Sequence, residues 1–408
     1  MTACRFCRTP LRHSFVDLGL SPVSNAFVRP QDAHAPERFY PLATFVCEAC
    51  LLVQLPAHEP RETHFHENYA YFSSFTESWL QHARRYVETM TQRLGLTRDS
   101  QVIEVASNDG YLLQYFVQAG IPALGIEPSA NVARAAQEKG VPSLVRFFGM
   151  ALAQELREQG VQADLLLGNN VLAHVPDIND FVGGLALALK PGGVLTLEFP
   201  HLLELITHNQ FDTIYHEHYS YLSLLALRRI FAAHGLGVFD VERLETHGGS
   251  LRLHVAHAGE DRPVRDSVEA CLADERRAGL DRLETYAAFA ERVAETKRKL
   301  LTFLIEAKRA GKSVVGYGAP AKGNTLLNYC GIRTDFIDYT VDRNPHKQGC
   351  LLPGTRIPVV APERIFETKP DYVLILPWNI APEVCERMAG IAAWGGRFVA
   401  PIPEPRVL

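Results

Sequence analysis

The segment 211–221, which reads FDTIYHEHYSY, gathers histidine, glutamate and tyrosine on a few consecutive positions. Tyr215, Glu217 and His218 carry groups that take up, hold or donate protons. The segment therefore predicts a general base with supporting groups, while an exposed histidine cluster and a metal site are the alternatives. A metal is disfavoured because neighbouring side chains alternate in direction and no His-x-x-x-His spacing occurs here.

Two further segments carry groups of the same kind. His174 follows Asn169 and Asn170, just past the expected end of a parallel strand, where ligand clefts form in open α/β sheets. Its alternative is a solvent-facing histidine at a helix start. Tyr69 belongs to the aromatic and hydroxyl-rich run NYAYFSS, which fits either an active-site segment or a packed aromatic seam.

The turn from Glu104 to Gly110, EVASNDG, follows an expected strand and opens an expected helix. Small residues there let the backbone approach a ligand, and helix amides face its polar groups. Glu127 comes 23 residues after Glu104 and precedes Pro128, so its carboxylate is placed to accept from ribose hydroxyls. The alternative is a tight turn without ligand. The lack of three spaced glycines disfavours a dinucleotide.

Four of the eight cysteines form two Cys-x-x-Cys pairs separated by 39 residues, and they are Cys4, Cys7, Cys47 and Cys50. Tetrahedral zinc requires four such thiolates at about 2.3 Å. A closed set without an open position predicts a structural zinc site, and two unrelated pairs of reduced cysteines are the alternative. The other four cysteines are scattered, and we expect no disulfide.

A glycine-rich run near the C-terminus, GYGAPAKGNT, joins an expected strand to an expected helix. Its backbone amides and Lys322 can hold phosphate charge, and Tyr317 and Asn324 stand in the same run. It is not a Walker A loop. A plain strand–helix connection with an exposed lysine is the alternative.

The elements that must position these groups alternate between short β-branched runs and helical periods. Between residues 101 and 258 the pattern predicts a parallel sheet covered on both faces, with two late strands at 237–242 and 250–256 forming an antiparallel edge. A second alternating block covers 313–400, and a helix or helical pair covers 260–310. Residues 1–60 lack long apolar periods and look irregular, and 76–94 reads as a helix.

The predicted fold is therefore α/β in three parts: a zinc-binding domain at 1–75, a Rossmann-like domain at 76–259, and a helical linker with a second small α/β domain at 260–408. We expect a monomer or small homo-oligomer.

Composition narrows the class of protein. The chain has 408 residues, 47% hydrophobic and 21% charged, with a formal charge of −5. This balance lacks the basic footprint of a nucleic-acid binder and fits a neutral or mildly anionic small substrate. No stretch resembles a signal peptide or approaches the roughly 18 apolar residues of a membrane span, so we expect a cytoplasmic protein without membrane contact.

The turn resembles motif I of class I methyltransferases, with Ala106 and Asn108 in place of the first two glycines. Together with the cysteine pairs, the segment 215–218 and the GYGAPAKGNT run, it resembles the sugar C-methyltransferases that act on nucleotide-linked 4-keto-deoxysugars. This resemblance implies S-adenosylmethionine and zinc as cofactors. The residues that it assigns to the cofactor are Glu104, Ala106, Asn108, Asp109, Gly110, Glu127, Pro128, Asn169 and Asn170.

The same resemblance implies that His218 is the general base, with Tyr215, Glu217, His174 and Tyr69 as further active-site residues, and that the C-terminal domain helps to hold the nucleotide sugar. The expected reaction is methylation at C-3 through an enolate, with Glu217 orienting or polarising His218. An O- or N-methyltransferase and a non-catalytic nucleotide-sugar-binding scaffold are the alternatives.

Overall fold

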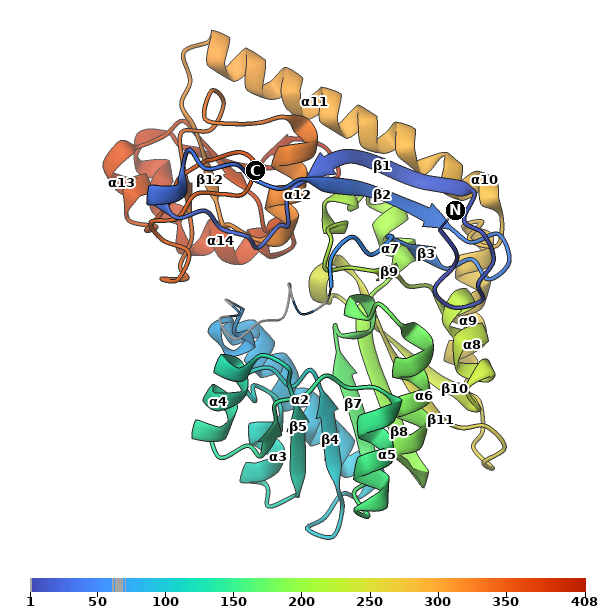
Figure 1. Cartoon of the computed structure of the whole chain (residues 1–408). Helices are drawn as coiled ribbons and strands as arrows, with labels where there is room; N and C mark the ends of the chain where they lie inside the picture. Colours follow the sequence, from blue (N-terminus) through green and yellow to red (C-terminus); the bar gives the residue numbers. More distant parts are fainter. Residues whose placement is uncertain (1, 61, 63–68, 70) are drawn as a thin grey trace.

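The computed structural model describes residues 2–60, 62, 69 and 71–408, and within these residues the strands form three sheets of four, seven and six strands (Figure 1). The seven-stranded sheet lies in the middle of the chain, in the order β10-β11-β8-β7-β4-β5-β6. Its strands are β4 (Val102–Val105), β5 (Ala123–Ile126), β6 (Ser143–Leu144), β7 (Ala163–Asn169), β8 (Leu189–Pro200), β10 (Leu236–Leu244) and β11 (Ser250–His257).

The predicted parallel sheet is confirmed, since β4, β5, β6, β7 and β8 pair in parallel. All four residues of β4 are buried, including Glu104, so both faces of this strand are covered, as in a parallel sheet between two layers of helices. The antiparallel edge is also confirmed, because β11 lies between β8 and β10 and pairs antiparallel with both.

Helices cover both faces of this sheet (Figure 1). On one face pack α2 (Glu77–Leu94), α3 (Leu113–Gln118) and α4 (Ala130–Glu138). On the other face pack α5 (Met150–Glu158), α6 (Ile178–Ala188) and α8 (Leu224–Ala233). The short strand β6 and helix α5 were not predicted from the sequence. Because β4, β5 and β7 pair in parallel, their carboxyl ends lie along the same edge of the sheet, and the candidate ligand-binding residues follow these ends.

The N-terminal segment is more regular than expected. It forms an antiparallel sheet from β1 (His13–Ser21), β2 (Tyr40–Val46), β3 (Val53–Gln54) and β9 (Ser220–Tyr221). The expectation of an irregular segment was wrong. Bulges between Ser14 and Val16 and between Asp17 and Leu20 interrupt the alternation of buried and exposed side chains in β1, so the strand shows no period of two in the sequence. The last strand, β9, comes from the middle of the chain and pairs with β3.

Three helices follow the central sheet, where one or two were expected: α9 (Asp266–Arg277), α10 (Leu283–Ala287) and α11 (Phe289–Arg309). Gly279 ends the first of them with a φ of 83°, a conformation that favours glycine. The long α11 lies along β1 and β2 (Figure 1).

The C-terminal block forms the expected second α/β unit, a sheet in the order β14-β13-β12-β15-β16-β17. Its strands are β12 (Val314–Tyr317), β13 (Thr340–Val341), β14 (Val359–Val360), β15 (Tyr372–Ile375), β16 (Arg397–Ala400) and β17 (Arg406–Val407). Its helices are α12 (Ala321–Cys330), α13 (Arg364–Thr368) and α14 (Ala381–Arg387).

One apolar core joins the N-terminal sheet, residues 202–221 and the C-terminal block. Phe15 of β1, for example, stacks on Phe289 of α11 with ring centroids 4.6 Å apart. The domain boundaries at 75 and 259 stay a prediction. Among the described helices, none combines the length and apolar character needed to cross a bilayer.

Candidate active site

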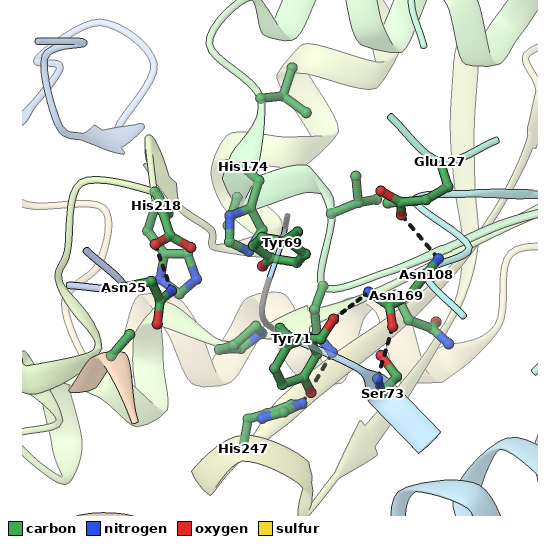
Figure 2. A pocket seen from close by; sticks show the side chains of 18 of the residues that line it. Asn25, Tyr69, Tyr71, Ser73, Asn108, Glu127, Asn169, His174, His218 and His247 are labelled. Carbon is green, nitrogen blue, oxygen red and sulfur yellow. Dashed lines mark hydrogen bonds between the residues drawn. The ribbon is translucent and has the colours of Figure 1, made fainter. Parts of the chain in front are cut away.

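A cavity of about 380 Å³ lies between the edge of the central sheet, the segment before α2 and the C-terminal block (Figure 2). Twelve of the predicted site residues line it: Tyr69, Ala106, Asn108, Glu127, Pro128, Asn169, Asn170, His174, Tyr215, Glu217, His218 and Lys322. One space therefore holds the proposed cofactor residues and the proposed base.

Backbone conformation shapes the cofactor end of this cavity. Ala106 and Asn108 have φ values of 58° and 48°, and Gly110 has 71°. The residues that replace the motif I glycines thus keep a glycine-like conformation, at a cost of about 1–2 kcal/mol each. Such strain is characteristic of ligand sites.

Glu127 is held by this turn. Its Oε2 accepts from the backbone N–H of Asn108 at 3.1 Å, and its Oε1 accepts from the N–H of Ser129 at 2.8 Å. The carboxylate is 4% exposed, yet it lines the cavity. A rigid acceptor at this position fits the ribose of S-adenosylmethionine, and the open turn at Ala106 leaves room for the rest of that cofactor.

The segment before α2 is fastened over the turn. Asn108 accepts from the N–H of Ser73 at 2.8 Å and donates to the carbonyl of Tyr71 at 3.2 Å. Asn131 donates to the carbonyl of Tyr69 at 2.8 Å. Tyr69 and His174 both line the cavity (Figure 2).

Three of the predicted cofactor residues belong to the turn but do not line the cavity. Glu104 is fully buried, and burial raises its carboxyl pKa well above the ordinary value. Asp109 pairs with Lys139 at 3.0 Å. Gly110 packs so tightly that a Cβ there would lie 3.1 Å from the Cβ of Ala136. These residues support the turn.

The other end of the cavity is built from ionisable side chains. The ring of His218 lies 4.0 Å from that of Tyr215 and 4.7 Å from that of His174, between centroids. Its Nδ1 lies 2.9 Å from the carbonyl oxygen of Thr213. Since a carbonyl only accepts, Nδ1 carries the proton of the neutral ring and Nε2 keeps its lone pair. Burial, with His174 adding to it, lowers the pKa of His218 well below its ordinary value, so the ring is neutral at pH 7.

Glu217 is 3% exposed, and its Oε1 accepts from Asn25 Nδ2 at 2.7 Å. Burial raises its pKa to about 7. The Thr213 carbonyl, and not Glu217, holds Nδ1 of His218, and the expectation that Glu217 orients or polarises His218 stays a prediction. Burial also raises the pKa of Tyr215 well above its ordinary value, so the phenol keeps its proton as a donor.

Of the predicted substrate residues, only Lys322 reaches the cavity. Its Nζ donates to Asn379 Oδ1 at 2.9 Å and lies 4.6 Å from the ring centroid of Trp378. Burial lowers its pKa, against the attraction of nearby Asp212. Tyr317 instead packs in the core of the C-terminal sheet. Asn324 donates to the carbonyl of Ser24 at 2.6 Å, which ties α12 to the N-terminal segment.

The four paired cysteines come together at the start of the N-terminal sheet. The Sγ atoms of Cys4 and Cys50 are 3.6 Å apart, those of Cys7 and Cys47 are 3.4 Å apart, and all four lie within 4.8 Å of one another. Four thiols at these separations fit the corners of a tetrahedral zinc site.

The sequence did not predict several residues of the cavity lining, among them Asn25, Trp79 and His247. Asn25 stands in an N-terminal loop without a motif, and Trp79 falls within the helix expected at 76–94. A signal did exist for His247, because the following Gly248 and Gly249 mark an unusual turn.

Comparison with known proteins separates the chain into three matched regions. Residues 4–65 match a zinc binding domain, residues 79–241 a methyltransferase domain, and residues 245–403 a C-methyltransferase C-terminal domain. The C-methyltransferase NovU of Streptomyces niveus is 38% identical over 408 residues, which cover 99% of this chain and 96% of that protein. The chain belongs to this C-methyltransferase family.

Other similarities cover only part of this C-methyltransferase. A ubiquinone biosynthesis O-methyltransferase from a Bradyrhizobium species is 29% identical over 28% of the chain and 46% of its own length. The crystal structure of magnesium protoporphyrin IX methyltransferase from Synechocystis, with bound SAH, aligns with a TM-score of 0.36 and 18% identity, over 44% of this chain and 83% of that one.

The predicted family, α/β fold class and enzymatic class are therefore confirmed, and S-adenosylmethionine and zinc are the cofactors of this C-methyltransferase. The roles of the individual site residues stay predictions.

Proposed function

We propose that this C-methyltransferase methylates C-3 of a nucleotide-linked 4-keto-deoxysugar through an enolate formed by His218. The observation that carries the proposal is the setting of that histidine. It lines the same cavity as the cofactor turn, its Nδ1 is fixed by Thr213, and its neutral Nε2 remains as a proton acceptor. Methylation of carbon needs such a base, because a C–H bond offers no lone pair.

In this mechanism His218 Nε2 removes the C-3 proton, which the neighbouring 4-keto group acidifies. The negative charge moves onto the keto oxygen, where Tyr215 or His174 donates a hydrogen bond. When bound, S-adenosylmethionine supplies the electrophilic methyl group. The residues around Glu127 and Asn108 would hold the methyl donor close to the enolate carbon. The new C–C bond would then form as the methyl–sulfur bond breaks, and the sulfur would keep the electron pair of that bond and leave as a thioether.

Lys322 supports the assignment of an anionic substrate. It is the lysine of the GYGAPAKGNT run, it lines the cavity from the C-terminal block, and Asn379 holds its ammonium group. In the proposal this positive charge faces the phosphates that link the sugar to its nucleotide. Tyr69 lines the same cavity.

The test is a mass-spectrometric screen for methyl transfer to 4-keto-deoxysugars linked to dTDP, GDP and CDP. We expect a mass gain of one methyl group on one of them. A second measurement follows deuterium exchange beside the ketone in the absence of cofactor. Exchange supports enolate formation, whereas methyl transfer to oxygen or nitrogen without exchange would contradict the C-3 proposal.

A further inference from the structure

His247 lies in the turn between β10 and β11 with φ 56° and ψ 18°, and its ring lines the cavity. Figure 2 shows it on the side of the pocket opposite His174. A left-handed conformation costs a residue with a Cβ about 1–2 kcal/mol. A strained residue facing a ligand cavity suggests a function, provided that its surroundings enforce the strain.

The surroundings do enforce it. Gln210 Nε2 donates to the carbonyl of Gly248 at 2.7 Å, and Thr246 Oγ1 donates to Glu198 Oε1 at 2.9 Å. A Cβ on Gly248 would lie 2.8 Å from the ring of Trp378. The turn is thus fixed from the central sheet and from the C-terminal block, and the ring of His247 is held in one place.

The ring contacts Asn170, the residue that follows β7. Nδ2 of Asn170 lies 3.1 Å from Nε2 of His247. An amide nitrogen only donates, so Nε2 accepts and the proton of the neutral ring stands on Nδ1. Burial, with Lys322 adding to it, lowers the pKa of His247 to about 4, which keeps the ring in this accepting form at neutral pH.

This contact decides how the Asn170 carboxamide is turned. Asn170 itself has φ 56° and lines the cavity. With Nδ2 engaged by His247, the other end of the amide, Oδ1, is buried, and no group among the described residues donates to it. A buried acceptor left without a donor is costly, by about 1–3 kcal/mol. A ligand that brings a donor to Oδ1 removes that cost.

We infer that His247 is a positioning residue, which fixes the Asn170 carboxamide so that Oδ1 accepts a hydrogen bond from a bound ligand. The ligand's N–H or O–H group belongs either to the α-ammonium group of S-adenosylmethionine or to a hydroxyl of the methyl acceptor. The acceptor half of this inference rests on the proposed function, and the cofactor half does not.

The experiment compares His247→Gln with His247→Met. The two side chains have similar length and shape and carry the same backbone strain, but only glutamine offers an acceptor to Asn170. Calorimetry measures the dissociation constant of S-adenosylmethionine, and steady-state assays measure KM and kcat for the acceptor sugar. We expect H247M to raise one of the two constants about tenfold and H247Q to stay within about threefold of the wild type.

A double-mutant cycle tests the coupling. Asn170→Gly removes the carboxamide and tolerates the left-handed conformation, so it isolates the side chain. In the N170G background, H247M should have no further effect on the constant that it raises in the wild type.

Equal losses in H247Q and H247M would show a merely structural role and overturn the inference, as would no change in either constant. A wild type that methylates none of the 4-keto sugars would count against the proposed function, and the calorimetric measurement would then decide the inference by itself. Which constant moves identifies the ligand.

Discussion

At the cofactor end of the cavity, backbone conformation and backbone amides hold the ligand-facing groups, whereas the opposite end consists of ionisable side chains packed against one another. Glu127 accepts from two main-chain N–H groups, and Ala106 and Asn108 are left-handed. His218, by contrast, is surrounded by the rings of His174 and Tyr215. The first arrangement suits binding of one fixed cofactor, and the second suits proton transfer.

The largest effect should come from the ionisable end. We expect His218→Asn to lower kcat about 10²- to 10⁴-fold, because a positioned base contributes that much, while the dissociation constant of S-adenosylmethionine stays within about threefold. Turnover at saturating substrates and calorimetry measure the two quantities. His208→Asn is the control, since His208 is exposed and lies outside the cavity lining. Near-normal turnover of H218N would remove His218 as the base.

Loss of zinc should also affect the ionisable end of the cavity. Gln54 belongs to β3, which pairs with β9, and its Nε2 donates to Cys4 Sγ at 3.2 Å. The next residue, Leu55, donates its backbone N–H to the carbonyl of Tyr219 at 3.0 Å. Cys47→Ser should weaken zinc binding and so loosen the N-terminal sheet, to which β9 belongs directly after residues 215–219. We expect kcat to fall about tenfold or more while S-adenosylmethionine still binds.

Elemental analysis should find about one zinc per wild-type chain and less in C47S. Loss of cofactor affinity equal to the loss of kcat would show that the two ends are not separable in this way.

A change at the cofactor end should weaken the binding of S-adenosylmethionine and leave kcat nearly unchanged. In Glu127→Gln one of the two backbone amides faces an NH₂ group instead of a carboxylate oxygen, so we expect the dissociation constant of S-adenosylmethionine to rise about tenfold to a hundredfold. At saturating cofactor, kcat should stay within about threefold. Glu138→Gln, an exposed change on the adjoining α4, is the control. A large fall in kcat with unchanged affinity would contradict the comparison.

The smallest effect concerns stability. The folded pKa of Glu217, about 7, lies above its ordinary value, so the native state keeps a proton that the unfolded chain has lost between pH 4.5 and 7. The free energy of unfolding therefore falls as pH rises through this window. Glu217→Gln keeps an acceptor for Asn25 and cannot ionise. We expect it to be more stable than the wild type by about 1–3 kcal/mol at pH 8, with the difference vanishing near pH 4. Urea unfolding at both pH values measures this.

Local pattern was sufficient for much of the fold. The pattern predicts strands at 101–106, 123–127 and 163–170 and helices at 110–119, 129–139 and 178–189. These ranges agree with β4, β5, β7, α3, α4 and α6 to within about three residues, because apolar periodicity and turn residues encode such elements locally. The two-residue strand β6 and the strand β1 escaped, because the first is too short to show a period and the second is interrupted by bulges.

Part of the candidate site could likewise be predicted from local sequence, and part could not. Sequence alone determined the four cysteines, the turn from Glu104 to Gly110 and the cluster at 215–218, since each is a local arrangement of residue types. Only the tertiary structure decided that Asn25 reaches Glu217 across 192 positions and that Asn170 meets His247 across 77. Such contacts depend on how whole sheets pack against one another and on which residues adopt a strained backbone conformation. The periodicity of the sequence indicates neither the packing of the sheets nor the positions of strain.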